Sequence, residues 1–109
     1  MGKVHWSWEA ELKEGELENF KSLIKQWNII ASEDSATLSN EWFISDDGRL
    51  VRVLQTFSDA NSALNQFGVN LWSALDNHVT PKEMYVSGDY GDTLDFLRKH
   101  GATFMVQLN

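Results

Sequence analysis

The hydrophobic period of this chain changes between its first two segments. Apolar and polar residues alternate from Val4 to Leu12, whereas apolar residues recur every three or four positions from Leu17 to Ile30. Alternation predicts a half-buried strand, and the longer period predicts an amphipathic helix. A chain that combines both elements is expected to fold as sheet packed on helix, in the α+β class.

The later segments extend this pattern. Asp46-Asp47-Gly48 is a hairpin turn signal between two strand-like runs. Gly68 interrupts the second helical pattern, which weakens the prediction of one regular helix there. After these strands, Thr37–Ser45 and Arg49–Phe57, we expect a second helix that is capped by Ser58 and has Asp59 in its first turn. Its apolar face contains Ala60, Ala63, Leu64, Phe67, Leu71 and Leu75. The remaining expected elements are a loop at Pro81, strand Glu83–Ser87, a short helix Thr93–His100 that ends at Gly101, and strand Ala102–Leu108.

The first six elements follow a ferredoxin-like β-α-β-β-α-β order, to which a short helix and a C-terminal strand are added. Residues 1–109 then form a single domain, a size typical of one domain. Both helices are expected on one face of an antiparallel sheet. The other face would also be apolar, which predicts a second copy of the chain as its cover, with candidate residues Phe43, Leu50, Leu54, Tyr85, Phe104 and Val106.

Charge and cysteine content exclude several functions. The net charge of −7 would repel a phosphate backbone, so nucleic acid is not an expected partner. The absence of cysteine excludes disulfides, thiolate catalysis and Cys-ligated zinc or iron–sulfur sites. The sequence contains no apolar run of about 18 residues and no signal peptide at Met1–Leu12, so no membrane partner and a cytoplasmic location are expected.

Two stretches of the chain carry a family resemblance. Glu41 followed by Trp42-Phe43-Ile44-Ser45-Asp46-Asp47-Gly48 resembles a hairpin of antibiotic-biosynthesis-monooxygenase-like proteins. The stretch from Gln55 through Phe57-Ser58-Asp59 to Gln66-Phe67 resembles the strand-into-helix signature of that family, and Gly88-Asp89 extends the match. The resemblance implies a dimeric α+β barrel. Characterised members are cofactor-free oxygenases of quinols or aromatic polyketides, and haem-degrading enzymes.

This chain departs from the family at two positions. Gln55 stands where the family usually has Glu, and Gln66 stands where it usually has His. Glutamine can donate and accept hydrogen bonds but cannot take up a proton near neutral pH. Haem degradation is less expected, because the helix His that would bind iron is absent. We therefore expect neither a metal nor a cofactor.

Polar candidates for a site are Gln55, Gln66, Asn40 and His5. The two glutamines either face each other across a pocket or serve as hydrogen-bonded packing groups. Asn40 is either a satisfied core amide or a pocket group that holds a phenolate-like oxygen, and it is expected between Leu38 and Trp42 on one strand face. His5, on the polar face of the first strand, is the candidate base. His100 is assigned a structural role at a helix end.

Five tryptophans provide aromatic candidates. Trp6, Trp8 and Trp27 lie on apolar faces and are explained by core packing. Trp72 lies off the main face of its helix, so it is the better candidate for an interface or pocket-mouth residue, with core packing as the alternative. Trp42, Trp72 and Phe67 are the candidate ligand-binding residues for a flat aromatic compound.

Two functions remain open from the sequence. One is a small cofactor-independent monooxygenase-like enzyme, an oxidoreductase acting on an aromatic or quinol compound. The other is a non-catalytic small-molecule-binding or regulatory homodimer on the same scaffold. Loss of both titratable family residues favours the second, and the family resemblance favours the first.

Overall fold

The computed structural model describes residues 2–69 and 72–109. The predicted order of elements is confirmed, with the C-terminal strand in parallel to its neighbour and all other strand pairs antiparallel. The elements are β1 (Val4–Leu12), α1 (Leu17–Ser32), β2 (Thr37–Ile44), β3 (Leu50–Phe57), α2 (Ala60–Val69), α3 (Trp72–Leu75), β4 (Val79–Gly88), the 3₁₀ helix η1 (Asp95–His100) and β5 (Thr103–Met105).

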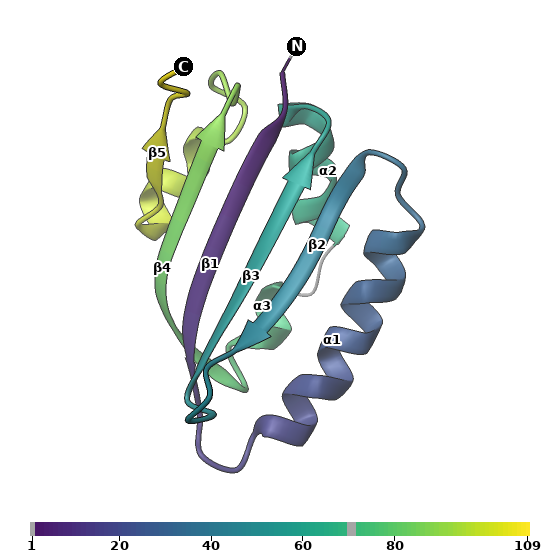
Figure 1. Cartoon of the computed structure of the whole chain (residues 1–109), viewed down its shortest axis with the longest axis vertical. Helices are drawn as coiled ribbons and strands as arrows, with labels where there is room; N and C mark the ends of the chain where they lie inside the picture. Colours follow the sequence, from purple (N-terminus) through teal and green to yellow (C-terminus); the bar gives the residue numbers. More distant parts are fainter. Residues whose placement is uncertain (1, 70–71) are drawn as a thin grey trace.

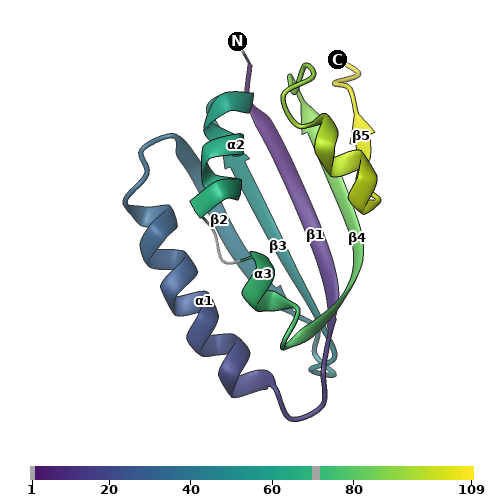
Figure 2. The same ribbon diagram turned by 180° about the vertical axis from the view of Figure 1, so that it is seen from behind.

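The sheet has the strand order β2-β3-β1-β4-β5, so β2 and β5 form its two edges. Figures 1 and 2 show α1, α2, α3 and η1 on one side of the sheet, with the other side uncovered. This is the ferredoxin-like α+β arrangement that the sequence predicts, extended by η1 and β5.

The core lies between the sheet and the helices. In β1 the side chains of Val4, Trp6, Trp8 and Ala10 are buried, because every second residue of a strand points to the same face. In the β1–β3 register these residues are paired with buried residues of β3. Buried side chains of α1 and η1 cover them from the helical side. The buried partners from these elements are Val51, Val53, Gln55, Phe57, Phe20, Leu23, Trp27, Leu94 and Leu97.

Glycine is required at one close approach. Gly88, the last residue of β4, has φ +103°, and a Cβ there would collide with the backbone oxygen of Lys3. The backbone N–H of Asp89 donates to that same oxygen at 3.1 Å. Only a residue without a side chain lets the two segments pass this closely.

Several local predictions are corrected. Pro81 lies inside β4 and not in a loop before it, next to a register shift where β1 changes partners between Glu9 and Ala10. A proline is tolerated at such an irregularity because a ladder hydrogen bond is already missing. At the start of α2 it is Asp59, not Ser58, whose side chain accepts from the backbone N–H of Ser62, at 2.8 Å.

The second predicted helix is divided into α2 and α3, and Leu71 lies outside the described residues. Leu38 is the extra residue where the β2–β3 register shifts and is 49% exposed, so it does not share a simple face with Trp42.

The last strand is shorter than predicted, and one of its residues lies on the other face. Phe104 packs on the helical side, with its ring 4.9 Å from that of Tyr90 and beneath the guanidinium of Arg98. Val106 lies beyond β5 and is 75% exposed. Phe104 is therefore removed from the predicted apolar set of the uncovered face.

Candidate functional site

A continuous cluster of aromatic rings fills the space between the sheet and the helices. The Trp27 ring centroid lies 4.9 Å from that of Trp72 and 5.2 Å from that of Trp42, both nearly perpendicular. Trp72 also contacts Trp8 at 5.5 Å and stacks on Phe67 at 5.5 Å. Edge-to-face contacts of this kind hold rings in fixed orientations. Trp72 therefore contacts the indole rings of the interior and also lines the cavity described next.

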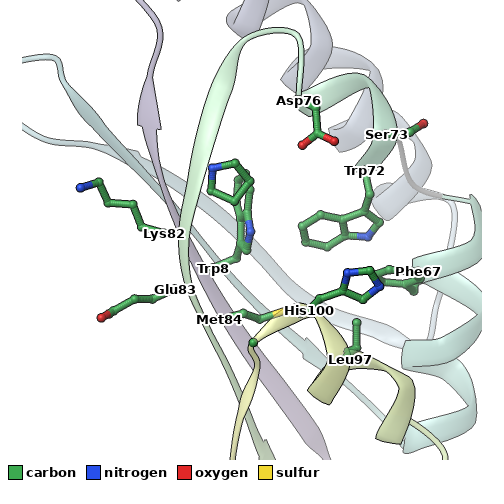
Figure 3. Close-up of a pocket in the computed structure, with 12 residues that line it drawn as sticks. Trp8, Phe67, Trp72, Ser73, Asp76, Lys82, Glu83, Met84, Leu97 and His100 are labelled. Carbon is green, nitrogen blue, oxygen red and sulfur yellow. The ribbon is translucent and has the colours of Figure 1, made fainter.

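Beside Trp72 lies a cavity of about 460 Å³, between α2, α3, β4 and η1. This volume is within the usual range for small-molecule sites. Figure 3 shows its wall of apolar and aromatic side chains, while Lys82 and Glu83 point away from the indole rings. Asp76 and His100 are the titratable groups that border the aromatic part. The apolar lining residues are Trp8, Phe67, Trp72, Pro81, Met84 and Leu97.

Gln55 is held in a chain of side-chain hydrogen bonds. Its oxygen accepts from the indole N–H of Trp6 at 2.6 Å, and its amide nitrogen donates to Asn40 at 3.0 Å. Asn40 in turn donates to Asn28 at 2.8 Å. Gln55 is 2% exposed whereas Asn28 is exposed, so the chain runs from the interior to the surface of α1. Since Trp6 can only donate, it fixes which end of the Gln55 amide faces inward.

Four buried polar atoms have no hydrogen-bond partner among the described residues. They are the indole nitrogens of Trp27, Trp42 and Trp72 and the side-chain oxygen of Gln66. Leaving such a group unpaired costs about 1–3 kcal/mol, so native interiors contain few of them. The three indole donors belong to one aromatic cluster, and they give it an unused capacity for hydrogen bonding. The Gln66 acceptor lies on α2, one residue before Phe67.

The structure brings some predicted site residues together and separates others. Gln55 and Asn40 are hydrogen-bonded to each other, whereas no hydrogen bond joins Gln55 to Gln66 among the described residues. Trp72 and Phe67 line the cavity, and Trp42 lies at the α1–β2 edge of the aromatic cluster.

His5 lies on the uncovered face of the sheet. It pairs with Thr56 across the strands, and its ring nitrogen lies 2.9 Å from the Thr56 hydroxyl. The sheet itself therefore separates His5 from Gln55, whose neighbour Trp6 points to the helices.

Asp76 and His100 border the cavity but were not among the predicted site residues. No local pattern marks them, because Asp76 follows α3 and His100 is the last residue of η1, two short helices whose placement depends on tertiary packing. The turn signal at Gly101 locates the end of η1, but it does not say what that end faces.

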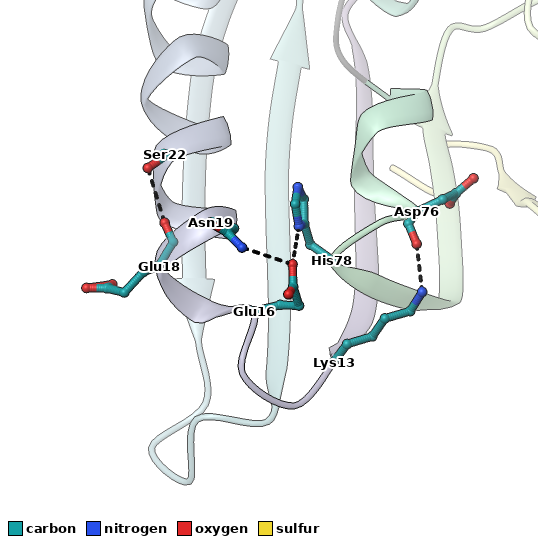
Figure 4. A network of polar contacts seen from close by, with 7 residues as sticks. All are labelled: Lys13, Glu16, Glu18, Asn19, Ser22, Asp76 and His78. Atoms are coloured by element: carbon teal, nitrogen blue, oxygen red, sulfur yellow. Dashed lines mark hydrogen bonds and ion pairs between the residues drawn. The ribbon is translucent and has the colours of Figure 1, made fainter.

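A polar network supports the base of α3, next to the cavity (Figure 4). The Glu16 carboxylate lies 2.7 Å from the ring nitrogen of His78 and accepts from Asn19 at 3.3 Å. These hydrogen bonds, with His78 the larger contributor, hold the pKa of Glu16 below its usual value. Lys13 donates to the backbone oxygen of Asp76 at 2.9 Å. The network therefore joins the β1–α1 connection to the segment that follows Trp72.

The uncovered face combines an apolar hollow with a band of charged residues. Phe43, Leu50 and Leu54 are 37–50% exposed and line a hollow of about 430 Å³. Arg52 and Glu9 also line this hollow and form an ion pair at 2.6 Å. On β4 the Tyr85 hydroxyl donates to Glu83, and this hydrogen bond raises the pKa of Tyr85.

No three His, Asp or Glu side chains of residues 2–69 and 72–109 gather as metal ligands would. No helix in this part of the chain has the length and apolar character needed to cross a bilayer.

Comparisons with known proteins find relatives by structure alone. No family model matches the sequence, and no curated protein matches it either. MupZ from Pseudomonas fluorescens has the same fold with a TM-score of 0.84 and 18% identity, over 100% of this chain and 93% of that one.

More distant structures agree. SnoaB, a cofactor-independent oxygenase from Streptomyces nogalater, matches with a TM-score of 0.66 and 10% identity, over 79% of this chain and 91% of its own. A conserved protein from Methanosarcina mazei Go1 matches with a TM-score of 0.68 and 12% identity, over 79% and 89% of the two chains. The ferredoxin-like α+β fold of the single chain is confirmed by these matches.

Proposed function

We propose that this chain, which shares the fold of a cofactor-independent oxygenase, is itself a small monooxygenase-like enzyme for an aromatic or quinol compound. The observation that carries the proposal is the cavity beside Trp72, because its stacked and perpendicular rings suit a flat ligand. Aromatic rings recognise each other by offset-stacked and edge-to-face contacts.

The unpartnered polar atoms support the same proposal. A quinol or hydroxylated aromatic ketone carries oxygens that accept from indole N–H groups, and hydroxyls that donate to an amide oxygen. Trp72, which lines the cavity, carries such a donor, and its indole N–H is buried and has no partner among the described residues. Donors that are already in place and shielded from water stabilise developing negative charge most effectively.

The reaction needs no cofactor if the substrate itself reduces oxygen. A ring CH₂ flanked by phenolic rings loses a proton, and the carbanion transfers an electron to dioxygen. The radical pair combines to a C–OOH group, which loses water and leaves a C=O group. The carbon is oxidised by four electrons, one oxygen atom stays in the product, and the other leaves as water. The protein must supply a proton acceptor, oriented donors and a dry pocket.

We assign the proton-accepting role to His100. It borders the cavity, which Phe67 also lines (Figure 3). Among the described residues that line the cavity, His100 is the one that carries an imidazole, the side chain most often used as a general base. His5, the acceptor expected from the sequence, lies across the sheet.

The test is oxygen uptake with a panel of quinols and anthrone-type compounds. We expect uptake by the wild-type protein, a loss of tenfold or more in His100→Ala, and little change in His5→Ala. Equal activity of wild type and His100→Ala would overturn the assignment of the base. The absence of uptake with every compound would overturn the enzymatic proposal.

The second candidate is binding without turnover. It is favoured by Gln55, which stands in place of the family's usual acid and is held by Trp6 and Asn40. Under this alternative, quenching of tryptophan fluorescence reports saturable binding of the same compounds while oxygen uptake stays at background. Fluorescence quenching and oxygen uptake, measured with the same compounds, therefore distinguish an enzyme from a binding protein.

We also propose that the protein is a homodimer through the uncovered sheet face. Phe43, Leu50 and Leu54 lie next to one another there and remain exposed in a single chain. Monomers seldom leave such patches uncovered. Sedimentation at micromolar concentration should give twice the 12.5 kDa chain mass, and a species at the chain mass would overturn the dimer.

A further inference from the structure

Asp76 lies on the same face of the α3 segment as Trp72. The two residues are four positions apart, a spacing that puts two side chains next to each other on a helix. Asp76 follows the last residue of α3, and the turn continues past it, because the backbone N–H of His78 donates to the backbone oxygen of Leu75 at 2.8 Å. Figure 3 shows both side chains on the cavity side of α3, and both residues line the cavity.

The backbone of Asp76 is held in place while its side chain has no partner. Its backbone oxygen accepts from the Nζ atom of Lys13 at 2.9 Å. Figure 4 shows the side-chain carboxylate directed away from Lys13. This carboxylate has no hydrogen bond or ion pair with any other described residue. Because an ionised carboxylate can only accept hydrogen bonds, it is available to a hydroxyl group of a bound ligand.

The lining residues Lys82 and Glu83 already have partners outside the cavity. The Nζ atom of Lys82 lies 3.3 Å from the carboxylate of Glu11, and Glu83 accepts from the Tyr85 hydroxyl at 3.1 Å. Lys82 is the one Lys or Arg among the described residues that line the cavity. A ligand carboxylate would therefore meet the negative charge of Asp76 without an unpaired Lys or Arg to bind it.

This arrangement favours one chemical class of ligand over another. A carboxylate that enters the cavity loses part of its hydration and gains no opposite charge, which weakens its binding. A hydroxyl group on an uncharged ring donates to the Asp76 carboxylate, and a hydrogen bond to an ionised acceptor is stronger than one between neutral groups. The two effects act in the same direction, and their difference is the specificity of the site.

We infer that Asp76 makes the cavity selective for uncharged, hydroxylated aromatic compounds over carboxylated ones. A hydroxyl group of the ligand donates to Asp76, while the aromatic ring packs against Trp72 and Phe67, which line the same cavity. This inference rests on the proposed function and narrows its substrate class.

Two ligands that differ in one substituent test the selectivity. Both are a dihydroxyanthrone, with either a hydroxymethyl or a carboxylate group at the same ring position. Their dissociation constants are measured by quenching of tryptophan fluorescence in the absence of dioxygen, so that no turnover occurs. We expect the wild-type protein to bind the hydroxymethyl compound about tenfold more tightly or better. In Asp76→Asn this preference should fall to about threefold or less, because the negative charge is lost.

Asp46→Asn is the matched control. It removes the same charge from an exposed aspartate in the turn between β2 and β3, which is not among the described residues that line the cavity. We expect it to keep the wild-type preference, whereas Asp76→Lys should reverse it. An unchanged preference in Asp76→Asn and Asp76→Lys overturns the inference, as does equal binding of the two compounds by the wild type.

Salt provides a readout that a purely structural role of Asp76 would not change. Raising the ionic strength from about 0.01 M to about 0.15 M shortens the range of charge interactions from about 30 Å to about 8 Å. Since Asp76 is exposed, the wild-type preference should shrink over this range, and the smaller preference of Asp76→Asn should stay constant.

Oxygen uptake with the same two compounds separates this inference from the proposed function. Uptake with equal kcat/KM for both compounds overturns the selectivity and leaves the enzymatic proposal in place. Selective binding without uptake overturns the enzymatic proposal and supports the role of Asp76. Absence of binding by both compounds overturns the two together.

Discussion

The indole N–H of Trp6 donates to the side-chain oxygen of Gln55 across 2.6 Å, from one strand to its neighbour in the buried layer. Trp27 is equally buried, yet its indole nitrogen has no partner among the described residues. Two tryptophans in one core therefore differ in a single hydrogen bond, which makes them a matched pair for measurement.

Trp6→Phe should destabilise the protein more than Trp27→Phe, by about 1–3 kcal/mol. Both changes remove the same atoms from a buried site, but only Trp6→Phe leaves the Gln55 oxygen unpaired. The free energy of unfolding in urea, compared between the two variants, gives the difference. Equal losses would mean that the 2.6 Å contact contributes nothing net.

Gln55→Glu should make stability depend on pH. A protonated Glu can accept from Trp6 and donate to Asn40, as Gln does, whereas the ionised form is buried with one donor lost. Burial then raises the pKa of the new carboxyl in the folded state above its unfolded value of about 4.3. The folded state binds the proton more tightly, so the variant loses stability as pH rises above about 4. Urea unfolding between about pH 4 and pH 8, relative to wild type, measures this slope, and a flat difference contradicts it.

Gln66→Met should not weaken the ligand-free fold. The Gln66 oxygen is buried and has no partner among the described residues, so an apolar side chain of similar length removes a cost of about 1 kcal/mol or more. Affinity for hydroxylated aromatics should stay unchanged, because Gln66 is not among the described residues that line the cavity. Thermal unfolding and fluorescence titration check the two effects, with exposed Gln26→Met as the control. A clear loss of stability would show that the amide has a structural partner.

Glu16→Gln should reduce the acid sensitivity of the protein. The folded pKa of Glu16 is lowered by His78 and Asn19, so the folded state binds its proton less readily than the unfolded state. Its contribution is present above the unfolded pKa and is lost as pH falls through the folded one. The difference between wild type and variant should therefore shrink as pH falls from about 5 to about 3. Glu18→Gln, whose carboxylate is exposed beside Lys21, should show no such trend.

Much of the fold follows from periodicity. The bounds of β1 match the alternating stretch, and α1 starts at the residue where the period changes. The Pro81 prediction fails because a register shift is a relation between two strands, which no local pattern contains. Phe104 was placed on the wrong face because β5 has three residues, too few for alternation to be read.

The site was less predictable than the fold. The contact of Gln55 with Asn40 follows from cross-strand register, since they are direct partners on neighbouring strands. The cavity depends on how α3 and η1 sit against β4, and neither helix has more than six residues. Such short elements are positioned by packing and not by their own sequence.

The close contact of Trp27 with Trp72 also affects how the protein absorbs light. Two indoles with centroids 4.9 Å apart and planes at 84° couple their electronic transitions. Coupled transitions produce a pair of circular-dichroism bands of opposite sign in the far ultraviolet, where they overlap the helix signal. Helix content fitted from such a spectrum will be in error, and disappearance of the band pair will report the loss of side-chain packing around Trp27 and Trp72.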